Sequence, residues 1–264
     1  MNRLTLFFAV IGRWTCERLR CLGSFSLFIL SAFTSIGRVR HPFAKIRQQV
    51  FFIGFKSLPV IIMTALFTGM VLGLQGQHIL GNFGAEGLLG SAVAVALVRE
   101  LGPVLTALMV VGQAGSSMTS EIGIMRNSEQ IDALKTMAID VTGFLVMPRM
   151  WAALLCFPLL TAIFDLIGIT GGYLSGIVFM DADAGNYWHQ VDYSLGASDV
   201  MEGFTKSLVF GLLVTATCCY HGFLVNERPN LFGSKGVSKV TTMAVVRSSI
   251  LILTADFVVT ALFI

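Results

Sequence analysis

Five long stretches of this sequence carry almost no charge, and they constrain the fold more than any other feature. A helix needs about 20 predominantly apolar residues to cross roughly 30 Å of bilayer hydrocarbon. The stretches, each long enough or nearly so with its flanks, are residues 57–74, 87–119, 150–180, 207–226 and 248–264. They predict an all-α integral membrane protein with five transmembrane helices.

The composition agrees with this prediction and excludes several other classes. Only 12% of the 264 residues are charged, against about 25% in a typical soluble domain. This balance argues against a disordered tail, a disulfide scaffold and an ordinary cytosolic enzyme. The five cysteines form no C-x-x-C pair, so a zinc site or other metal site is not expected. We expect an N-terminal amphipathic or interfacial helix over residues 1–45 and one five-helix domain over residues 46–264.

Lysine and arginine alternate between the predicted loops and so indicate an orientation. Residues 1–47 hold eight of these cations, the loops at 120–149 and 227–240 hold three each, and the loops at 75–86 and 181–199 hold none. Cytoplasmic loops are enriched in lysine and arginine. The N-terminus is therefore predicted to be cytoplasmic and the C-terminus to lie on the opposite side of the membrane.

Residues 22–37 form a sixth apolar segment that fits this count poorly. A straight helix of 16 residues is only about 24 Å long, and basic residues flank the segment on both sides. We interpret the N-terminal region as a helix lying in the inner membrane interface, with its arginines reaching the headgroups. A plain sixth span is the alternative, although it would place one arginine cluster on the wrong side.

Charged residues within the predicted spans are candidates for function, because each is costly in hydrocarbon. Arg99 and Glu100 lie well inside the second span, and Pro103 cannot donate a backbone hydrogen bond to the Arg99 carbonyl. We therefore expect a kinked or unwound helix that faces a substrate cavity, the alternative being a buried Arg99–Glu100 brace. Asp165 and Asp256 are expected to serve structural pairing.

Three further charges lie near predicted span ends. There the long side chains can reach the membrane surface, and snorkelling is a sufficient explanation for them. They are Glu202, Lys206 and Arg247.

A short amphipathic helix is predicted over residues 127–137, in a cytoplasmic loop. Asn127 suits the N-cap, Gln130 would complete a variant of the capping box, and Glu129 and Asp132 favour the first turn. Its apolar face would consist of Ile131, Leu134 and Met137. Because its polar face is acidic and suits anionic lipid poorly, we expect it to dock into a protein partner rather than onto the membrane.

Motifs for nucleotide binding and hydrolysis are missing from the sequence. It contains no G-x-x-x-x-G-K-[ST], no H-E-x-x-H and no G-x-S-x-G, and no basic–aromatic pattern suggests nucleic acid. We predict a chain without catalytic residues, although an intramembrane lipid- or peptide-processing enzyme and a passive envelope scaffold remain alternatives.

Several motifs, taken in order, resemble those of the MlaE permease family, also called YrbE. They are GMVLGLQG at 69–76, VRELGPVLTAL at 98–108, SEIGIMR at 120–126, SEQIDAL at 128–134 and DFVVTAL at 256–262. The resemblance covers about residues 45–264. One departure is Gln113, which stands where the family commonly has arginine, so no role of that arginine is carried over.

The resemblance implies the inner-membrane subunit of an ABC transporter that moves phospholipids between the inner and outer membranes of a Gram-negative bacterium. It implies a homodimer, a cytoplasmic ATPase that binds ATP and magnesium, a periplasmic ring of MCE-domain proteins and a small accessory subunit. The chain itself would hold no cofactor.

The resemblance also suggests roles for individual residues. Those matching positions at the lipid cavity are Leu72, Arg99, Glu100 and Lys206. Those in the segment that resembles the coupling helix toward the ATPase are Arg126, Glu129, Gln130 and Asp132.

Overall fold

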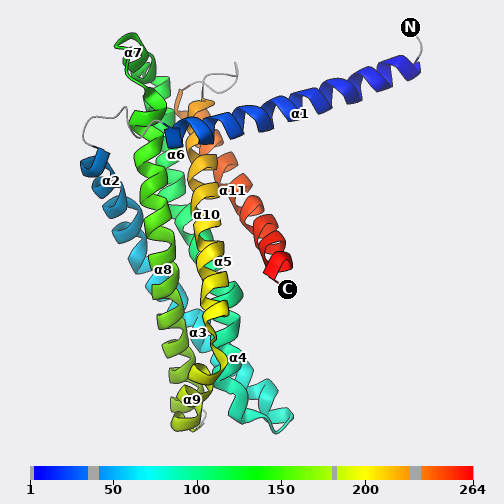
Figure 1. The fold of residues 1–264 in the computed structure, drawn as a ribbon, viewed down its shortest axis with the longest axis vertical. Helices are drawn as coiled ribbons and strands as arrows, with labels where there is room; N and C mark the ends of the chain where they lie inside the picture. Colours follow the sequence, from blue (N-terminus) through cyan, green and yellow to red (C-terminus); the bar gives the residue numbers. More distant parts are fainter. Residues whose placement is uncertain (1–2, 35–41, 180–182, 226–232, 264) are drawn as a thin grey trace.

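The computed structural model describes residues 3–34, 42–179, 183–225 and 233–263. Every regular element in these ranges is helical (Figure 1). Five helices are long and apolar enough to cross a membrane, namely Phe43–Asn82, Glu86–Asn127, Thr142–Val178, Ala197–Phe223 and Gly233–Phe263. The prediction of five spans is therefore confirmed for the described part of the chain.

Several of the spans are built from consecutive helical segments. The first contains α2 (Pro42–Val50), η2 (Phe51–Phe55) and α3 (Lys56–Asn82). The second contains η3 (Glu86–Leu88), α4 (Leu89–Ala96), η4 (Leu97–Leu101), α5 (Gly102–Val110), η5 (Val111–Gly115) and α6 (Ser116–Asn127). The third contains η6 (Thr142–Val146), α8 (Met147–Tyr173) and η7 (Leu174–Val178), while α10 (Ala197–Phe223) and α11 (Gly233–Phe263) are the fourth and fifth.

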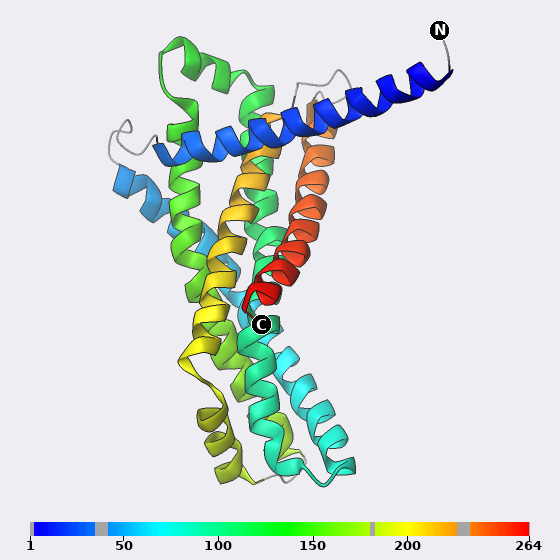
Figure 2. The ribbon, with the colours of Figure 1, turned by 45° about the vertical axis from the view of Figure 1, so that its right-hand side comes forward.

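Two short helices mark the opposite ends of the bundle. The helix α7 (Gln130–Thr136) lies at one end, and α9 (Ala184–Ser194) lies at the other (Figure 1). The last helix, α11, ends well short of the α9 end (Figure 2). The bundle is therefore taller than its fifth helix.

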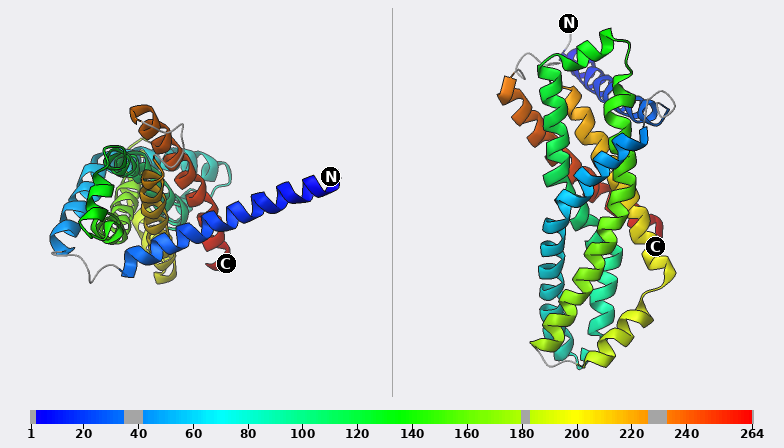
Figure 3. Two further views of the ribbon diagram at one scale, coloured as in Figure 1. Left: turned by 90° about the horizontal axis from the view of Figure 1, so that it is seen from above. Right: turned by 90° about the vertical axis from the view of Figure 1, so that its left-hand side faces the viewer.

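The N-terminal helix α1 (Arg3–Thr34) crosses the α7 end of the bundle and extends beyond it (Figures 1 and 3). Phe28 anchors it through edge-on ring contacts with Tyr220 and Phe223 near the end of α10. This transverse course differs from that of the five spans. The expected location in the membrane interface stays a prediction.

Glycine contacts bring α3 and α8 together at backbone distance. A Cβ built on Gly69 would lie 1.9 Å from the Gly168 carbonyl oxygen, and one on Gly171 would lie 2.5 Å from the Leu66 carbonyl oxygen. Such spacing lets helix backbones touch. Gly69, Gly168 and Gly171 thus pack two helices of the same chain.

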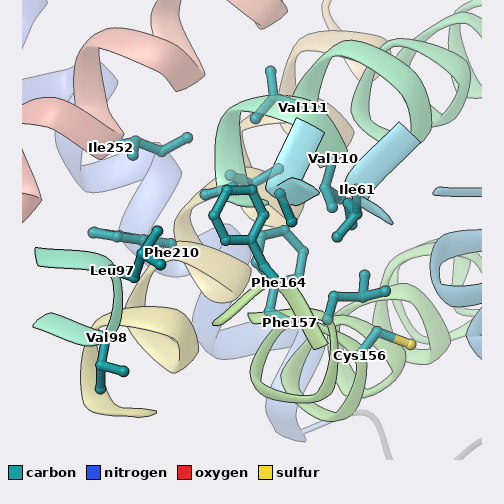
Figure 4. Close-up of a cluster of buried hydrophobic side chains, with 14 of the residues drawn as sticks. Ile61, Leu97, Val98, Val110, Val111, Cys156, Phe157, Phe164, Phe210 and Ile252 are labelled. Atoms are coloured by element: carbon teal, nitrogen blue, oxygen red, sulfur yellow. The ribbon is translucent and has the colours of Figure 1, made fainter. Parts of the chain in front are cut away.

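The main hydrophobic core lies where the spans meet (Figure 4). Phe157 and Phe164 of α8 and Phe210 of α10 are almost wholly buried there. Leu97 of η4 and Ile252 of α11 are among the residues that the other spans contribute. This core fixes η4 against α8 and α10.

The second span differs in kind from the kinked or unwound helix that Pro103 predicts. Residues Leu97–Leu101 form a π-helical turn and Gly102 continues into α5, with helical dihedral angles at both junctions. A π turn widens the helix by one residue and so accommodates a proline without breaking the chain's course. Arg99 and Glu100 lie in this widened turn.

Candidate functional site

The η4 turn presents Arg99 to the start of α10. Arg99 Nε donates to Asp199 Oδ1 over 2.7 Å, and Nη2 forms an ion pair with the same carboxylate. Asp199 also accepts from the Gly196 backbone nitrogen at 2.8 Å and so caps α10. One carboxylate therefore fixes both the guanidinium and the helix start.

Lys206 of α10 is the centre of the charged cluster. Its side chain is 0% exposed, and Nζ lies 2.9 Å from Glu100, 3.0 Å from Glu202 and 3.6 Å from Asp256. Nζ also donates to the Arg99 carbonyl oxygen over 2.7 Å. Thr260 Oγ1 adds a hydrogen bond of 3.2 Å to Glu100. The cluster thus joins η4, α10 and α11.

The position of Lys206 corrects the interpretation that it snorkels at a span end. The fourth span begins at Ala197, ten residues before the predicted start at residue 207. Lys206 and Glu202 therefore lie within the helix, one turn apart, and face the second span instead of the membrane surface. Arg247, the third residue placed at an end, lies 3.3 Å from His221 Nε2.

Close backbone approach makes this contact possible. A Cβ on Gly203 would lie only 2.5 Å from the Val98 carbonyl oxygen. The glycine therefore lets α10 press against η4, one turn before Lys206. The distance from Lys206 Nζ to the Arg99 carbonyl depends on this approach.

The members of the cluster differ in how far their side chains are exposed. The side chains of Arg99 and Glu100 are 46% and 41% exposed, whereas that of Lys206 is fully buried. Arg99 and Glu100 do not form the brace considered as an alternative, because each pairs with a residue of α10. Two cations meet four carboxylates here, so the cluster carries excess acidic groups in an apolar span.

The two aspartates predicted to serve structural pairing, Asp165 and Asp256, differ in whether they have a partner. Asp256 pairs with Lys206, as the structural interpretation predicts. Asp165 does not follow the prediction, since its buried Oδ1 has no hydrogen-bond partner among the residues described. It lies against Gly102, where an added Cβ would meet the carboxylate oxygen. The absence of a side chain at Gly102 is what leaves room for Asp165.

Leu72 and Gln113 lie outside the charged cluster's ion pairs. Leu72 of α3 is partly buried and packs against the main hydrophobic core. Gln113 of η5 donates from Nε2 to the Lys56 carbonyl oxygen over 2.7 Å, linking the first two spans. Glutamine thus serves as a neutral link at the position of the family's usual arginine.

The loop helix predicted over residues 127–137 is shorter than predicted, and the predicted capping box is wrong. Asn127 ends α6 and accepts from the Gly233 backbone nitrogen over 3.1 Å, while Gln130 begins α7. Glu129 precedes α7 with φ 58° and caps nothing with its side chain. The reason is the tight turn between α6 and α7, which the left-handed conformation of Glu129 completes.

The exposed face of α7 is polar. Arg126 Nη1 donates to Asp132 over 2.6 Å, and Lys135 Nζ lies 3.3 Å from the same oxygen. These two hydrogen bonds, of which the one from Arg126 has the larger effect, hold the pKa of Asp132 below its ordinary value. Ile131 is fully buried and packs inside the chain, while Met137 is 69% exposed. A partner would therefore meet the charged face and Met137.

Asp199 and Thr260 are cluster members that the sequence analysis did not identify. Asp199 lies three residues after Gly196 and precedes the predicted apolar run of the fourth span, so the sequence groups it with the acidic residues of the loop. The available signal for Asp199 was the Arg99 side chain, because a cation within an apolar span needs an acidic partner from elsewhere. Within the described ranges, no group of three or more histidine, cysteine or acidic side chains could hold a metal ion.

Comparison with known proteins gives a consistent family. A model described as permease MlaE matches residues 46–262. A probable ABC transporter permease protein of Rickettsia bellii is 43% identical over 253 residues, covering 96% of each chain. The intermembrane phospholipid transport system permease protein MlaE of Haemophilus influenzae is 38% identical over 257 residues, covering 97% of each. The protein described here is therefore a multi-pass membrane protein that belongs to the MlaE permease family.

Proposed function

We propose that this chain is the permease subunit of an ATP-driven transporter that moves phospholipids between the inner and outer membranes of a bacterium. It would lie in the inner membrane, with a cytoplasmic N-terminus, a periplasmic C-terminus and α1 in the inner interface. Family membership and the five spans support this proposal. The observation that carries it is the half-exposed Arg99 within an apolar span.

Arg99 is the proposed contact for the lipid headgroup. A guanidinium matches the geometry of a phosphate, and here it is already bound to Asp199. A phosphate must therefore compete with that carboxylate, which favours weak and reversible binding. Lys206 would position the turn rather than touch lipid, while Leu72 would contact acyl chains in a cavity between two copies of the chain.

The source of energy would be a separate ATPase. The chain carries no phosphate-binding loop of the G-x-x-x-x-G-K-[ST] type, so ATP and magnesium would bind to the partner. The α7 segment, with Arg126, Glu129, Gln130 and Asp132, would transmit the partner's movement. A ring of MCE-domain proteins would meet the opposite end of the bundle, and a small accessory subunit could join the ATPase.

Transport would then be a change in lipid affinity between two conformations. A partner that prefers one conformation shifts the population toward it, by as much as its differential affinity allows. The charged cluster joins three spans, so a movement of α10 or α11 would change the surroundings of Arg99. The chain itself would catalyse no reaction.

Mass spectrometry of the complex after gentle extraction from its native membrane tests this function. A stoichiometric ATPase, an MCE-domain protein and bound phospholipid are the expected result. A chain purified alone, without an ATPase, would contradict the proposal. It would redirect attention to an intramembrane enzyme or an envelope scaffold.

A second experiment tests Arg99 directly. Arg99→Gln should lower ATP-dependent transfer of labelled phospholipid between membranes while leaving the protein folded. Lys239→Gln, an exposed cation at the start of α11, is the matched control. Equal transfer by both variants would support the scaffold over the permease.

A further inference from the structure

A polar hollow lies at the α7 end of the bundle, away from the charged cluster. It has a volume of about 210 Å³ and lies between α2, α6, η6 and the start of α8. Its polar lining comes from Lys45, Gln48, Gln49, Glu121 and Arg149. Nothing in the transport proposal uses it.

The hollow has more cationic than anionic groups. Arg149 is 2% exposed and binds Glu121 through Nη2 at 2.7 Å and the Leu145 carbonyl through Nη1 at 2.8 Å. Lys45 Nζ lies 3.0 Å from the centre of the Phe144 ring. No carboxylate of the described ranges forms an ion pair with Lys45. One acidic group therefore faces two cations.

Two buried polar atoms at the hollow have no hydrogen-bond partner in the described chain. They are Arg149 Nε and Gln49 Oε1, a donor and an acceptor. Buried polar groups in native proteins are nearly always hydrogen-bonded, so an unsatisfied donor and acceptor beside one hollow indicate a polar occupant. The excess cation makes an anion the favoured occupant.

The hollow also lies where lipid phosphates would be found. Lys45 is near the start of the first span and Arg149 is near the start of the third, at the same end of the bundle. Farther along the first span, Phe51 and Phe55 are 58% and 64% exposed, and their rings stack with centroids 5.1 Å apart. Basic pockets between membrane helices at such a level suit anionic lipid headgroups.

We propose that this hollow binds the phosphate of an anionic phospholipid, with Lys45 and Arg149 as its cationic contacts. The lipid would be a resident of the inner leaflet rather than the transported molecule. The proposal rests on the membrane fold and on the proposed orientation, and it is independent of the transport mechanism.

The test is native mass spectrometry of the full chain in detergent, titrated with phosphatidylglycerol or with zwitterionic phosphatidylcholine. The wild-type chain should retain phosphatidylglycerol in preference to phosphatidylcholine. Lys45→Gln removes one cation and should weaken this retention about five-fold. Lys235→Gln, at an exposed lysine of α11, should leave it unchanged. Equal retention of both lipids, or no effect of Lys45→Gln, would overturn the proposal.

A variant with the opposite expected sign guards against misfolding as the explanation. Glu121→Gln removes the carboxylate that competes for Arg149, so it should strengthen phosphatidylglycerol retention about five-fold. Weaker retention in this folded variant would contradict the electrostatic argument. Inorganic phosphate that displaces the lipid at equal concentration would identify a soluble-anion site and refute a lipid one.

Discussion

The Lys206 ammonium group of the fourth span donates a hydrogen bond of 2.7 Å to the Arg99 carbonyl oxygen of the second span. In a regular α-helix that carbonyl would accept from residue 103, which is a proline without an N–H. A side chain of α10 thus supplies a donor that Pro103 cannot. The proline and the buried lysine together hold η4 to α10.

Replacing Lys206 with methionine should destabilise the protein strongly. The change removes the cation between Glu100, Glu202 and Asp256 and leaves three carboxylates around an apolar side chain. Breaking a buried ion pair by removing one partner costs about 3–5 kcal/mol. Thermal unfolding in detergent measures the loss.

Two companion variants make this prediction specific. Lys239→Met changes an exposed lysine and should unfold like wild type. Adding Glu100→Gln to Lys206→Met should recover part of the stability, because one uncompensated carboxylate is removed. A double variant no more stable than the single one would show that the cluster's charges are not the cause.

Gly203→Val should separate α10 from η4. An added Cβ would lie 2.5 Å from the Val98 carbonyl oxygen, so the helices must move apart, and overpacking of this kind costs about 1–3 kcal/mol. Gly112→Ala is the control, since its Cβ would meet nothing within 4 Å. Thermal unfolding should show a loss for the first variant and none for the second.

Reversing the charges at α7 should release the proposed ATPase. Glu129→Lys with Asp132→Lys replaces an acidic surface and places lysines beside Arg126 and Lys135. Both sites are exposed, so the membrane fold should stay intact. Glu86→Lys with Asp183→Lys, at the other end, is the control. Copurification measures binding, and retained ATPase would refute the role of α7.

Acidity should have little effect on the Asp132 ion pairs near neutral pH. The pKa of Asp132 is held below its ordinary value, first by the Arg126 hydrogen bond and then by Lys135. A lowered pKa means that the contribution is present above the ordinary carboxyl range and is lost only as pH falls through the lowered value. Copurification that weakens already on mild acidification must have another titrating group as its cause.

Tyr187 of α9 should contribute stability that is lost in alkali. Its hydroxyl donates to the Ile169 carbonyl over 2.9 Å, and burial raises its pKa above the ordinary value. A raised pKa means that the contribution is complete below about pH 10 and falls as pH rises beyond it. Tyr187→Phe should cost about 1 kcal/mol at neutral pH and show a smaller alkaline loss.

The matched control for Tyr187 is Tyr193 of the same helix, which is 83% exposed. Tyr193→Phe should leave the thermal unfolding temperature unchanged at neutral pH. If the two variants lose the same stability, the hydrogen bond to Ile169 contributes nothing measurable.

The spans were predictable because the bilayer demands long apolar runs, and such runs are visible without knowing any contact. Their ends were not. The fourth span begins at Ala197, since Asp199 can enter a helix when Arg99 and the Gly196 backbone satisfy its carboxylate. That compensation comes from a residue 100 positions away, which no local pattern reveals.

In the charged cluster, too, one part was predictable from the sequence and another was not. Pro103 pointed to a special turn around Arg99 and Glu100, and the turn is there, although it is a π turn rather than a break. The partners of that turn could not be derived, because they depend on which faces of α10 and α11 meet η4. Asn127 shows that a local pattern can also mislead. Its residue type suits an N-cap, but it ends α6 and accepts a hydrogen bond from the Gly233 backbone nitrogen.

The glycine contact between α3 and α8 limits how this protein can change shape. Gly69 lies against the Gly168 backbone and Gly171 against that of Leu66, so neither helix can slide or rotate without collision. The pair therefore behaves as a fixed frame, and mobility is left to the helices around it. A tether between α3 and α8 should be harmless to a working transporter, while one between η4 and α10 should stop it.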